Sequence, residues 1–283
     1  MHIVPEPIDP VTEYDDRQAL MDLFQEHSDK ISQIKEVLQD DPLYDESKHD
    51  DLWILRFYLS QKNVEPSIKA AKHTLEFRNQ YKLDDWGDIR ATPPHQVKEG
   101  KVFEYLQCWK EDALIFTHPD PKRGVICFLK LTSMDQHKTV ETLTEDYWLS
   151  IFMYCAEWSF QWNDYVSRTT GRLTRSIRFV DASDIGWGSF NRECSRRDGN
   201  AMRVMEDCYP QMLESIYMCN PPGVVKILWG VVRVILPERV VAKFDMINPK
   251  EDEEERRRLY KHITEENLPE KYGGKNPVSP EHW

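Results

Sequence analysis

The amino-acid sequence predicts an α/β fold in which a helical N-terminal part precedes a mainly parallel sheet with helical crossovers. Over residues 16–88, large apolar residues recur at steps of three or four, which is the spacing of one helix face. After Thr92-Pro93-Pro94, short β-rich runs alternate with segments long enough for helices. With 283 residues, the chain is long enough to bury a full core.

The N-terminal part is expected to contain three helices. Six apolar residues indicate the first one: Leu20, Leu23, Phe24, Ile31, Ile34 and Leu38. Leu52, Leu55 and Leu59 repeat the pattern in the second. Pro66 suits a first helical turn, so the third helix is expected to begin there. We therefore expect a tail over residues 1–15 and a helical subdomain over residues 16–92.

The second part is expected to contain four strands. The β-rich runs are Val125–Leu131, Ile177–Val180, Ile216–Cys219 and Val241–Ile247. A helix over roughly Glu145–Trp162 presents apolar groups in nearly every direction, so it lies in the core or wraps a ligand. Candidate residues for lining an internal pocket are Cys127, Trp148, Phe152, Tyr154, Trp158 and Phe179.

Composition excludes several classes of protein. Lysine and arginine total 37 against 49 acidic residues, a net charge of −12, so no nucleic-acid partner is expected. Residues 1–10 contain no basic segment followed by an apolar run, so we expect no secretory signal and a cytoplasmic location. The six cysteines are scattered without zinc spacing and are expected to be small buried hydrophobes in a reducing compartment.

Motifs that carry enzymatic chemistry are weak in this chain. None of the glycines falls in a phosphate-binding pattern. Asp181 and Asp184 follow a β-rich run and offer carboxylates for Mg²⁺. They stand three residues apart, whereas haloacid-dehalogenase-like phosphatases place their two aspartates two residues apart, so a structural turn is the expected role. His118 and His137 flank the first β-rich run as haem-ligand candidates, although solvated loop histidines are the expected outcome. We therefore expect no catalytic residue, no metal and no cofactor.

The segment from Gly223 to Leu236 has an unusual pattern for a helix. Gly223, Lys226, Gly230 and Arg233 form one narrow stripe, and the rest is apolar. It is shorter than the roughly 20 apolar residues of a membrane-spanning helix. Such a helix covers a core, closes a pocket or contacts a bilayer surface with its two cations near headgroups.

Three segments in this order resemble the CRAL-TRIO family. They are Trp53–Leu59 followed by residues 64–78, Tyr209–Tyr217 followed by Asn220-Pro221-Pro222, and Asn267–Gly274 with its L-P-x-x-Y-G-G pattern. The resemblance implies a lipid-binding domain over residues 93–276, a tail over 277–283, and a hydrophobic pocket with a sheet floor, helical walls and a mobile gate helix.

The resemblance also implies a function. The expected activity is to bind one lipid-like molecule and carry or present it between membranes, as a monomer that touches membrane surfaces transiently. The gate-helix residues are Val224, Val225, Lys226, Leu228, Trp229, Val232, Arg233 and Ile235. Two alternatives remain open, namely a scaffold domain with a collapsed pocket and a haem-binding variant of the same fold.

Departures from the family pattern bear on the ligand. In phosphatidylinositol-binding members, a basic residue, a glutamate, a threonine and a lysine hold the headgroup. Their counterparts here are Gln61, Gln211, Val240 and Lys243, so only the lysine is kept and phosphatidylinositol is not expected as the main ligand.

At the family's phosphatidylcholine site, Ser176 matches a family serine, whereas Arg178 replaces the usual threonine. An inward arginine favours an anionic or carbonyl-bearing ligand. Strand alternation can equally direct it toward a neighbouring acid.

Overall fold

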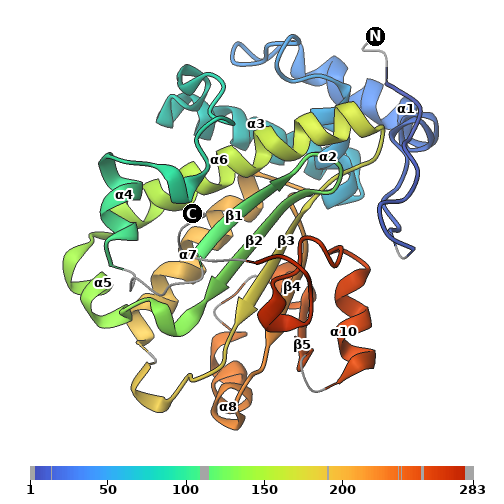
Figure 1. Cartoon of the computed structure of the whole chain (residues 1–283). Coiled ribbons are helices and arrows are strands. Elements are labelled where there is room, and N and C mark those ends of the chain that lie inside the picture. Colours follow the sequence, from blue (N-terminus) through green and yellow to red (C-terminus); the bar gives the residue numbers. More distant parts are fainter. Residues whose placement is uncertain are drawn as a thin grey trace.

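The structure is a computed structural model that describes residues 4–13, 15–108, 115–189, 191–234, 236, 238–249 and 252–277. An N-terminal group of helices sits at one end of a five-stranded sheet, and further helices cover both faces of that sheet (Figure 1). The α/β architecture predicted from the sequence is confirmed. The division at residues 15, 92 and 276 remains a prediction.

The three N-terminal helices are α1 (Leu20–Leu38), α2 (Asp51–Gln61) and α3 (Val64–Tyr81). They share one apolar core, to which all three predicted apolar faces contribute. Asp50 caps α2 by accepting a hydrogen bond from the Trp53 amide at 3.2 Å. The third helix begins two residues before Pro66, so proline occupies its third position.

The sheet contains β1 (Ile115–Asp120), β2 (Gly124–Lys130), β3 (Ser176–Asp181), β4 (Leu213–Cys219) and β5 (Phe244–Ile247). The strands lie in chain order; β1 pairs antiparallel with β2, and the other pairs are parallel. The four predicted strands are confirmed, with β5 starting three residues later than expected. The sequence analysis missed β1, which carries Pro119 and three polar residues among its six.

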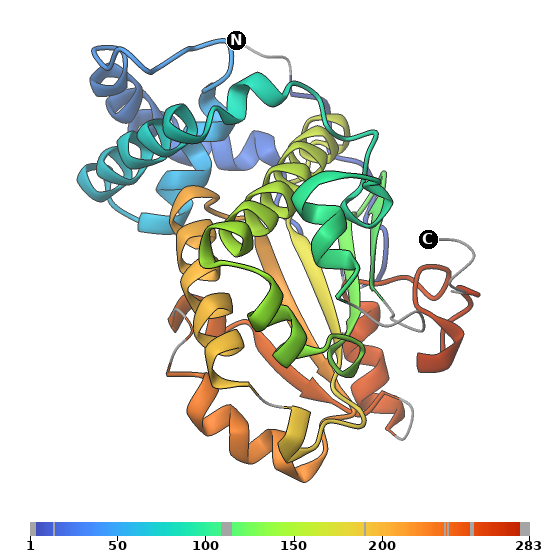
Figure 2. The same ribbon diagram turned by 90° about the vertical axis from the view of Figure 1, so that its left-hand side faces the viewer.

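Helices α4 (Gly100–Leu106), α5 (Gln136–Thr142), α6 (Glu145–Thr170) and α7 (Arg192–Cys208) cover one face of the sheet (Figure 2). The opposite face packs against α10 (Glu253–Tyr260) and the C-terminal segment after it. The short helices α8 (Gly223–Val232) and α9 (Glu238–Val241) connect β4 to β5. As predicted, Asn220-Pro221-Pro222 separates the end of β4 from the start of α8.

The C-terminal L-P-x-x-Y-G-G pattern fixes this opposite face. Tyr272 packs against Phe179 with ring centroids 4.5 Å apart, and its hydroxyl donates a hydrogen bond to the fully buried Asp181 carboxylate. Lys271 Nζ lies 2.9 Å from the same carboxylate. Gly273 adopts φ +90°, and a Cβ on Gly274 would overlap the Leu268 carbonyl, so both positions require glycine.

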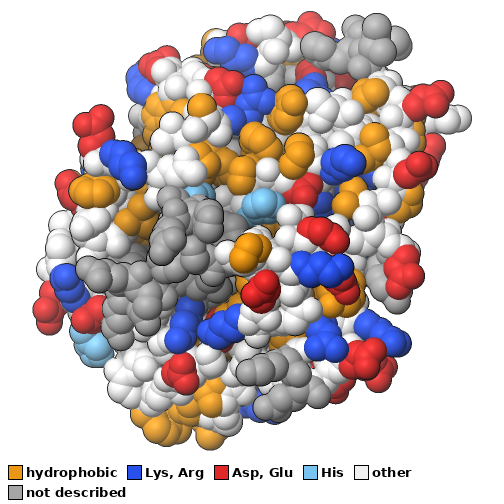
Figure 3. Space-filling model, in the orientation of Figure 1, with side chains coloured by type: hydrophobic (Ala, Val, Ile, Leu, Met, Phe, Trp, Pro, Cys, Tyr) orange, Lys and Arg blue, Asp and Glu red, His pale blue; other side chains and the backbone are white. Residues whose placement is uncertain are grey.

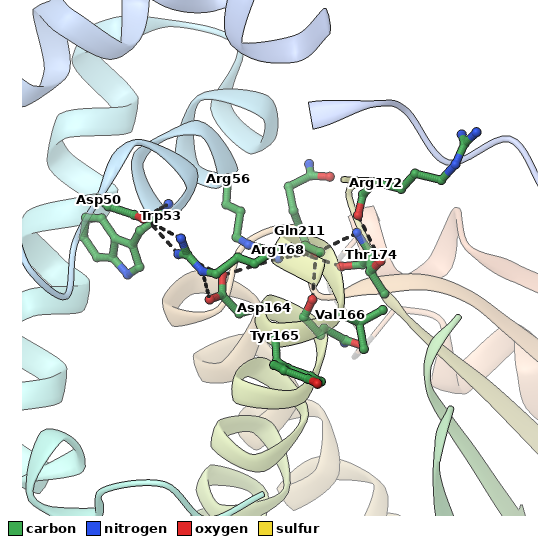
Figure 4. A network of polar contacts seen from close by, with 12 residues as sticks. Asp50, Trp53, Arg56, Asp164, Tyr165, Val166, Arg168, Arg172, Thr174 and Gln211 are labelled. Carbon is green, nitrogen blue, oxygen red and sulfur yellow. Dashed lines mark hydrogen bonds and ion pairs between the residues drawn. The ribbon is translucent and has the colours of Figure 1, made fainter. Parts of the chain in front are cut away.

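A polar network joins the N-terminal helices to the rest of the molecule (Figure 4). Arg168 of α6 forms ion pairs of 2.6 Å with Asp50 and with Asp164. The buried Arg56 of α2 donates to the Gln211 carbonyl at 3.3 Å and to Ser167 Oγ at 3.2 Å. The Trp53–Leu59 segment therefore positions the helical group on α6 and on the turn before β4.

Candidate functional site

Two adjacent cavities lie between the sheet and the helices of its α6 face. The first, of about 210 Å³, is bounded by β2, β3, α4, α6 and α7. The second, of about 260 Å³, extends toward α8 and β5. Five residues line both cavities: Tyr105, Leu129, Phe152, Arg178 and Met202. Each cavity alone is below the roughly 300–1,000 Å³ of common small-molecule pockets, and the two together reach that range.

A row of neighbouring strand residues forms the floor of both cavities. Thr117, Cys127, Arg178, Ile216 and Phe244 are successive partners across the five strands. The first two line one cavity, the last two line the other, and Arg178 lines both. Because side chains alternate along a strand, the arginine is held on the cavity face by the strand register itself.

The charges at this site are few. Within the part of the chain that the structure describes, Arg178 makes no hydrogen bond or ion pair. Asp198 of α7 faces the second cavity and accepts a hydrogen bond from Trp148 Nε1 at 2.9 Å. Burial raises the pKa of Asp198 to about 6, against the lowering effects of Trp148 and Arg178. Burial also raises the pKa of the Cys127 and Cys155 thiols, so both stay neutral.

Helix α8 has two different apolar sides. On its inner side Val225, Leu228 and Trp229 line the second cavity, and Trp229 packs 4.4 Å from the Phe244 ring. On its outer side Ile227 and Val231 are 63% and 51% exposed, and the segment after the helix adds Val234 at 76%. Apolar side chains gather at this end of the surface (Figure 3). The inner side therefore closes a cavity, while the outer side has no cover in the described structure.

The other predicted gate residues occupy varied positions. Val224 is half-buried beside Met218, whereas Lys226 and Arg233 are exposed. The side chain of Val232 and the whole of Ile235 lie outside the described residues.

The predicted lining residues lie in three places: at the cavities, on the opposite face of the sheet, and in the contacts that α6 makes with neighbouring segments. Cys127 and Phe152 line the cavities. Phe179 does not, because it points to the opposite face of β3, where it contacts Phe128 and Tyr272.

The three other aromatic candidates on α6 contact neighbouring segments and line neither described cavity. Trp148 is buried between α6 and α7, and the Trp158 indole donates to the Arg90 carbonyl at 3.2 Å. Tyr154 donates to the Thr92 carbonyl at 2.9 Å. These side chains fasten α6 to its neighbours because a helix surrounded by protein needs apolar groups on all sides.

Among the headgroup candidates, Ser176, Arg178 and Val240 line the first cavity. Gln61, Gln211 and Lys243 line neither cavity. Gln61 ends α2, and Gln211 occupies a left-handed turn at φ +59°, where its carbonyl accepts from Arg56 (Figure 4). Lys243 precedes β5, and its carbonyl accepts from the Ile216 amide at 2.9 Å. These positions therefore do not gather around the described cavities.

The alternative chemistries gain no geometric support. His118 and His137 line neither cavity, and His137 Nδ1 lies 3.1 Å from the Asn191 amide nitrogen. Asp181 points to the filled face, whereas Asp184 sits at φ +66° in a turn and pairs with Lys130. In the described residues, no three histidine, cysteine or acidic side chains cluster as metal ligands.

Sequence reasoning missed several residues of the site. The α7 residues Asp198, Met202 and Met205, together with α4 residues Val102 and Tyr105, complete the walls. The spacing of Asp198, Met202 and Met205 at four and three residues was the available signal for α7. No helix within the described ranges combines the length and apolar character needed to cross a bilayer.

Comparison with known proteins places these features in context. The family model described as CRAL/TRIO domain matches residues 110–274. Two Arabidopsis thaliana proteins named phosphatidylinositol/phosphatidylcholine transfer proteins, SFH11 and SFH12, are each 22% identical over 80% of this chain. The chain spans 58% of SFH11 and 40% of SFH12.

A Caenorhabditis elegans protein named CRAL-TRIO domain-containing protein C34C12.6 is 34% identical over 27% of this chain and 18% of its own length. Among solved structures, the crystal structure of Sfh5 aligns with a TM-score of 0.57 at 13% identity. The alignment covers 94% of this chain and 91% of Sfh5. At that identity, the likeness concerns the fold.

Proposed function

The chain belongs to the CRAL/TRIO domain family, and from that premise we propose that it binds one lipid-like molecule in the two adjacent cavities. As a monomer in the cytoplasm, it carries or presents this molecule between membranes and catalyses no reaction on it. The observation that carries the proposal is the two-sided character of α8, which closes the second cavity with one side and leaves the other side bare.

Burial of hydrocarbon in the cavity offsets the cost of withdrawing the ligand's chains from a bilayer. Each CH₂ group removed from water is worth about 0.8 kcal/mol, so an apolar cavity matched to the ligand competes with a bilayer only where water is excluded. Val225, Leu228 and Trp229 supply that exclusion at the α8 end. Ile227 and Val231 offer their exposed apolar area to the acyl region of a membrane while the helix opens.

Phosphatidylinositol is not the main ligand in this proposal. Three of the four family headgroup positions, Gln61, Gln211 and Lys243, line neither cavity, and Val240 contributes no hydrogen-bonding group. The headgroup partners that would favour inositol phosphate are therefore missing from the cavity wall.

A vesicle transfer assay tests the role of α8. The double substitution Ile227→Ser and Val231→Ser removes exposed apolar area from its outer side. The matched control is Met21→Ser and Val37→Ser on α1, where the side chains are 49% and 41% exposed. We expect the α8 variant to stay folded and to transfer fluorescent phosphatidylcholine or a fluorescent fatty acid at least about tenfold more slowly.

The α1 control is expected to transfer at the wild-type rate. Equal rates for a folded α8 variant and the wild type, or equal losses in both variants, would contradict the proposed membrane contact.

A further inference from the structure

We infer that Arg178 binds the anionic group of the ligand, so that the cargo is an amphiphile whose carboxylate or phosphate lies between two apolar arms. The inference rests on the proposed function, since it names the class of molecule that the cavities accept. Two observations support it: the position of Arg178 between the two cavities, and the mainly apolar side chains around it.

The position of Arg178 is central rather than peripheral. Along its row of the sheet, it is flanked by Cys127 on β2 and Ile216 on β4, and these two residues line different cavities. From the helical side, Phe152 and Met202 also border both cavities. A group held by Arg178 therefore has apolar space on both sides, which suits a charged centre with chains that diverge from it.

The guanidinium is surrounded mainly by groups that cannot stabilise it. It is the one lysine or arginine among the described residues that line the two cavities. It has no hydrogen bond within the described structure, so its N–H donors remain available to a ligand. A cation among apolar side chains is unfavourable unless it is paired, and its planar fork fits a carboxylate or a phosphate in a bidentate manner.

The acid that lines the second cavity does not complete this pairing. Asp198 on α7 is held by the Trp148 indole at 2.9 Å and lies near the Cys194 thiol, 3.9 Å from Sγ. It forms no ion pair with Arg178 within the described residues, although it feels the arginine charge. An anionic ligand thus meets an attractive Arg178 and a repulsive Asp198. Removal of the aspartate charge is expected to strengthen binding of the anion.

The test measures binding of four lipids to the full chain by native mass spectrometry and by displacement of a fluorescent fatty acid. The probes are oleate for a carboxylate, dioleoyl phosphatidic acid for a phosphate, dioleoyl phosphatidylcholine for a zwitterion, and monoolein as an uncharged lipid. The variants are Arg178→Gln, Arg178→Lys and Asp198→Asn. Arg192→Gln removes the same charge from an exposed position at the start of α7 and serves as the control.

We expect the wild type to prefer oleate or phosphatidic acid over monoolein, and the preferred anion identifies the ligand's head. Arg178→Gln should lower affinity for that anion at least about tenfold and change monoolein affinity less than about twofold. Arg178→Lys should retain part of the affinity, Asp198→Asn should raise it, and Arg192→Gln should leave it unchanged.

Equal binding of charged and uncharged lipids that is insensitive to Arg178→Gln would overturn this inference and leave the lipid-carrier proposal intact. Binding of none of the four lipids would count against the carrier proposal itself. If Arg178→Gln does not fold, the lysine and Asp198→Asn variants decide: an unchanged anion affinity in both contradicts the inference.

Discussion

The two faces of β3 differ in how completely their polar and apolar groups are satisfied. On the α10 face, Phe179 packs against aromatic rings, and the buried Asp181 accepts bonds from Tyr272, Lys271 and the Ser183 amide. On the α6 face, the same strand borders two cavities with Ser176, Arg178 and Val180. One face is filled by the chain itself, whereas the other leaves the space in which we propose that a ligand binds.

The carboxylates of Asp181 and Asp198 show the same contrast. Burial alone would raise the pKa of Asp181, but the hydrogen bonds from Tyr272, Lys271 and Ser183 outweigh it and hold that pKa below its ordinary value. Burial dominates at Asp198 and raises its pKa to about 6. The number of hydrogen-bond partners held ready for the carboxylate therefore distinguishes the filled face from the cavity face.

The largest expected effect comes from truncating one aromatic ring on each face. Phe179→Ala should lower the free energy of unfolding by about 3–5 kcal/mol, because it opens a void in a filled core. Phe152→Ala, which enlarges existing cavities, should cost clearly less, about 1–2 kcal/mol. Urea denaturation of the ligand-free protein measures both free energies of unfolding. Equal losses would contradict the difference in packing between the two faces of the sheet.

Removal of the tyrosine hydroxyl tests the completed face more finely. Tyr272→Phe should lower stability by roughly 1.5–3 kcal/mol at neutral pH, because the ionised Asp181 loses a charge-assisted bond. A depressed carboxyl pKa stabilises the fold above the unfolded value of about 3.9, and this contribution disappears as pH falls further. The gap between variant and wild type should narrow below about pH 4; a gap independent of pH would mean that the bond to the ionised form is unimportant.

The opposite pH dependence is expected at the cavity face. Because the folded pKa of Asp198 is raised to about 6, its ionised form costs stability at pH 7.5, and the cost vanishes as pH falls toward 4. Asp198→Asn should therefore raise the free energy of unfolding by about 1–2 kcal/mol at pH 7.5, with the gain declining at lower pH. The groups facing this carboxylate are Trp148 on α6, Arg178 on β3 and Cys194 on α7. A destabilised variant at pH 7.5 would indicate that Asp198 and Arg178 support each other.

The smallest effect concerns the two cations of the segment that closes the cavity face. Lys226→Gln and Arg233→Gln should each weaken binding to phosphatidylserine vesicles by about 1 kcal/mol, and the loss should disappear at high salt. Sedimentation with vesicles measures this. A salt-independent loss would point to a change in the helix itself.

The sequence predicted the fold well where patterns are local. Helical spacing located α1, α2 and α3, and the apolar runs located four strands. The strand β1 was missed because Pro119 and His118 weaken its β signal, although it pairs antiparallel with β2 across the short connection of residues 121–123. The later start of β5 has a different origin, because Val241 is the last residue of the short helix α9.

The candidate site was predictable only in part. Strand alternation suffices to place Ser176 and Arg178 on one face and Phe179 on the other, once the register is known. The sequence alone does not say which face of the sheet carries the cavity. The sequence also does not say which side of α6 faces the cavity. Trp148, Tyr154 and Trp158 are predicted as pocket residues, whereas their polar atoms form hydrogen bonds with neighbouring segments. Asp198 faces the second cavity because of the way in which α7 crosses the sheet, which the sequence does not reveal.

We propose that a bound lipid fills the cavities on the α6 face of the sheet. Native mass spectrometry of the purified full chain, combined with organic extraction and lipid analysis, tests it most directly. We expect a 1:1 complex whose extra mass matches an amphiphile with an anionic group. A spectrum with only the polypeptide mass, and an extract without lipid, would contradict the claim and favour a scaffold with an unused cavity.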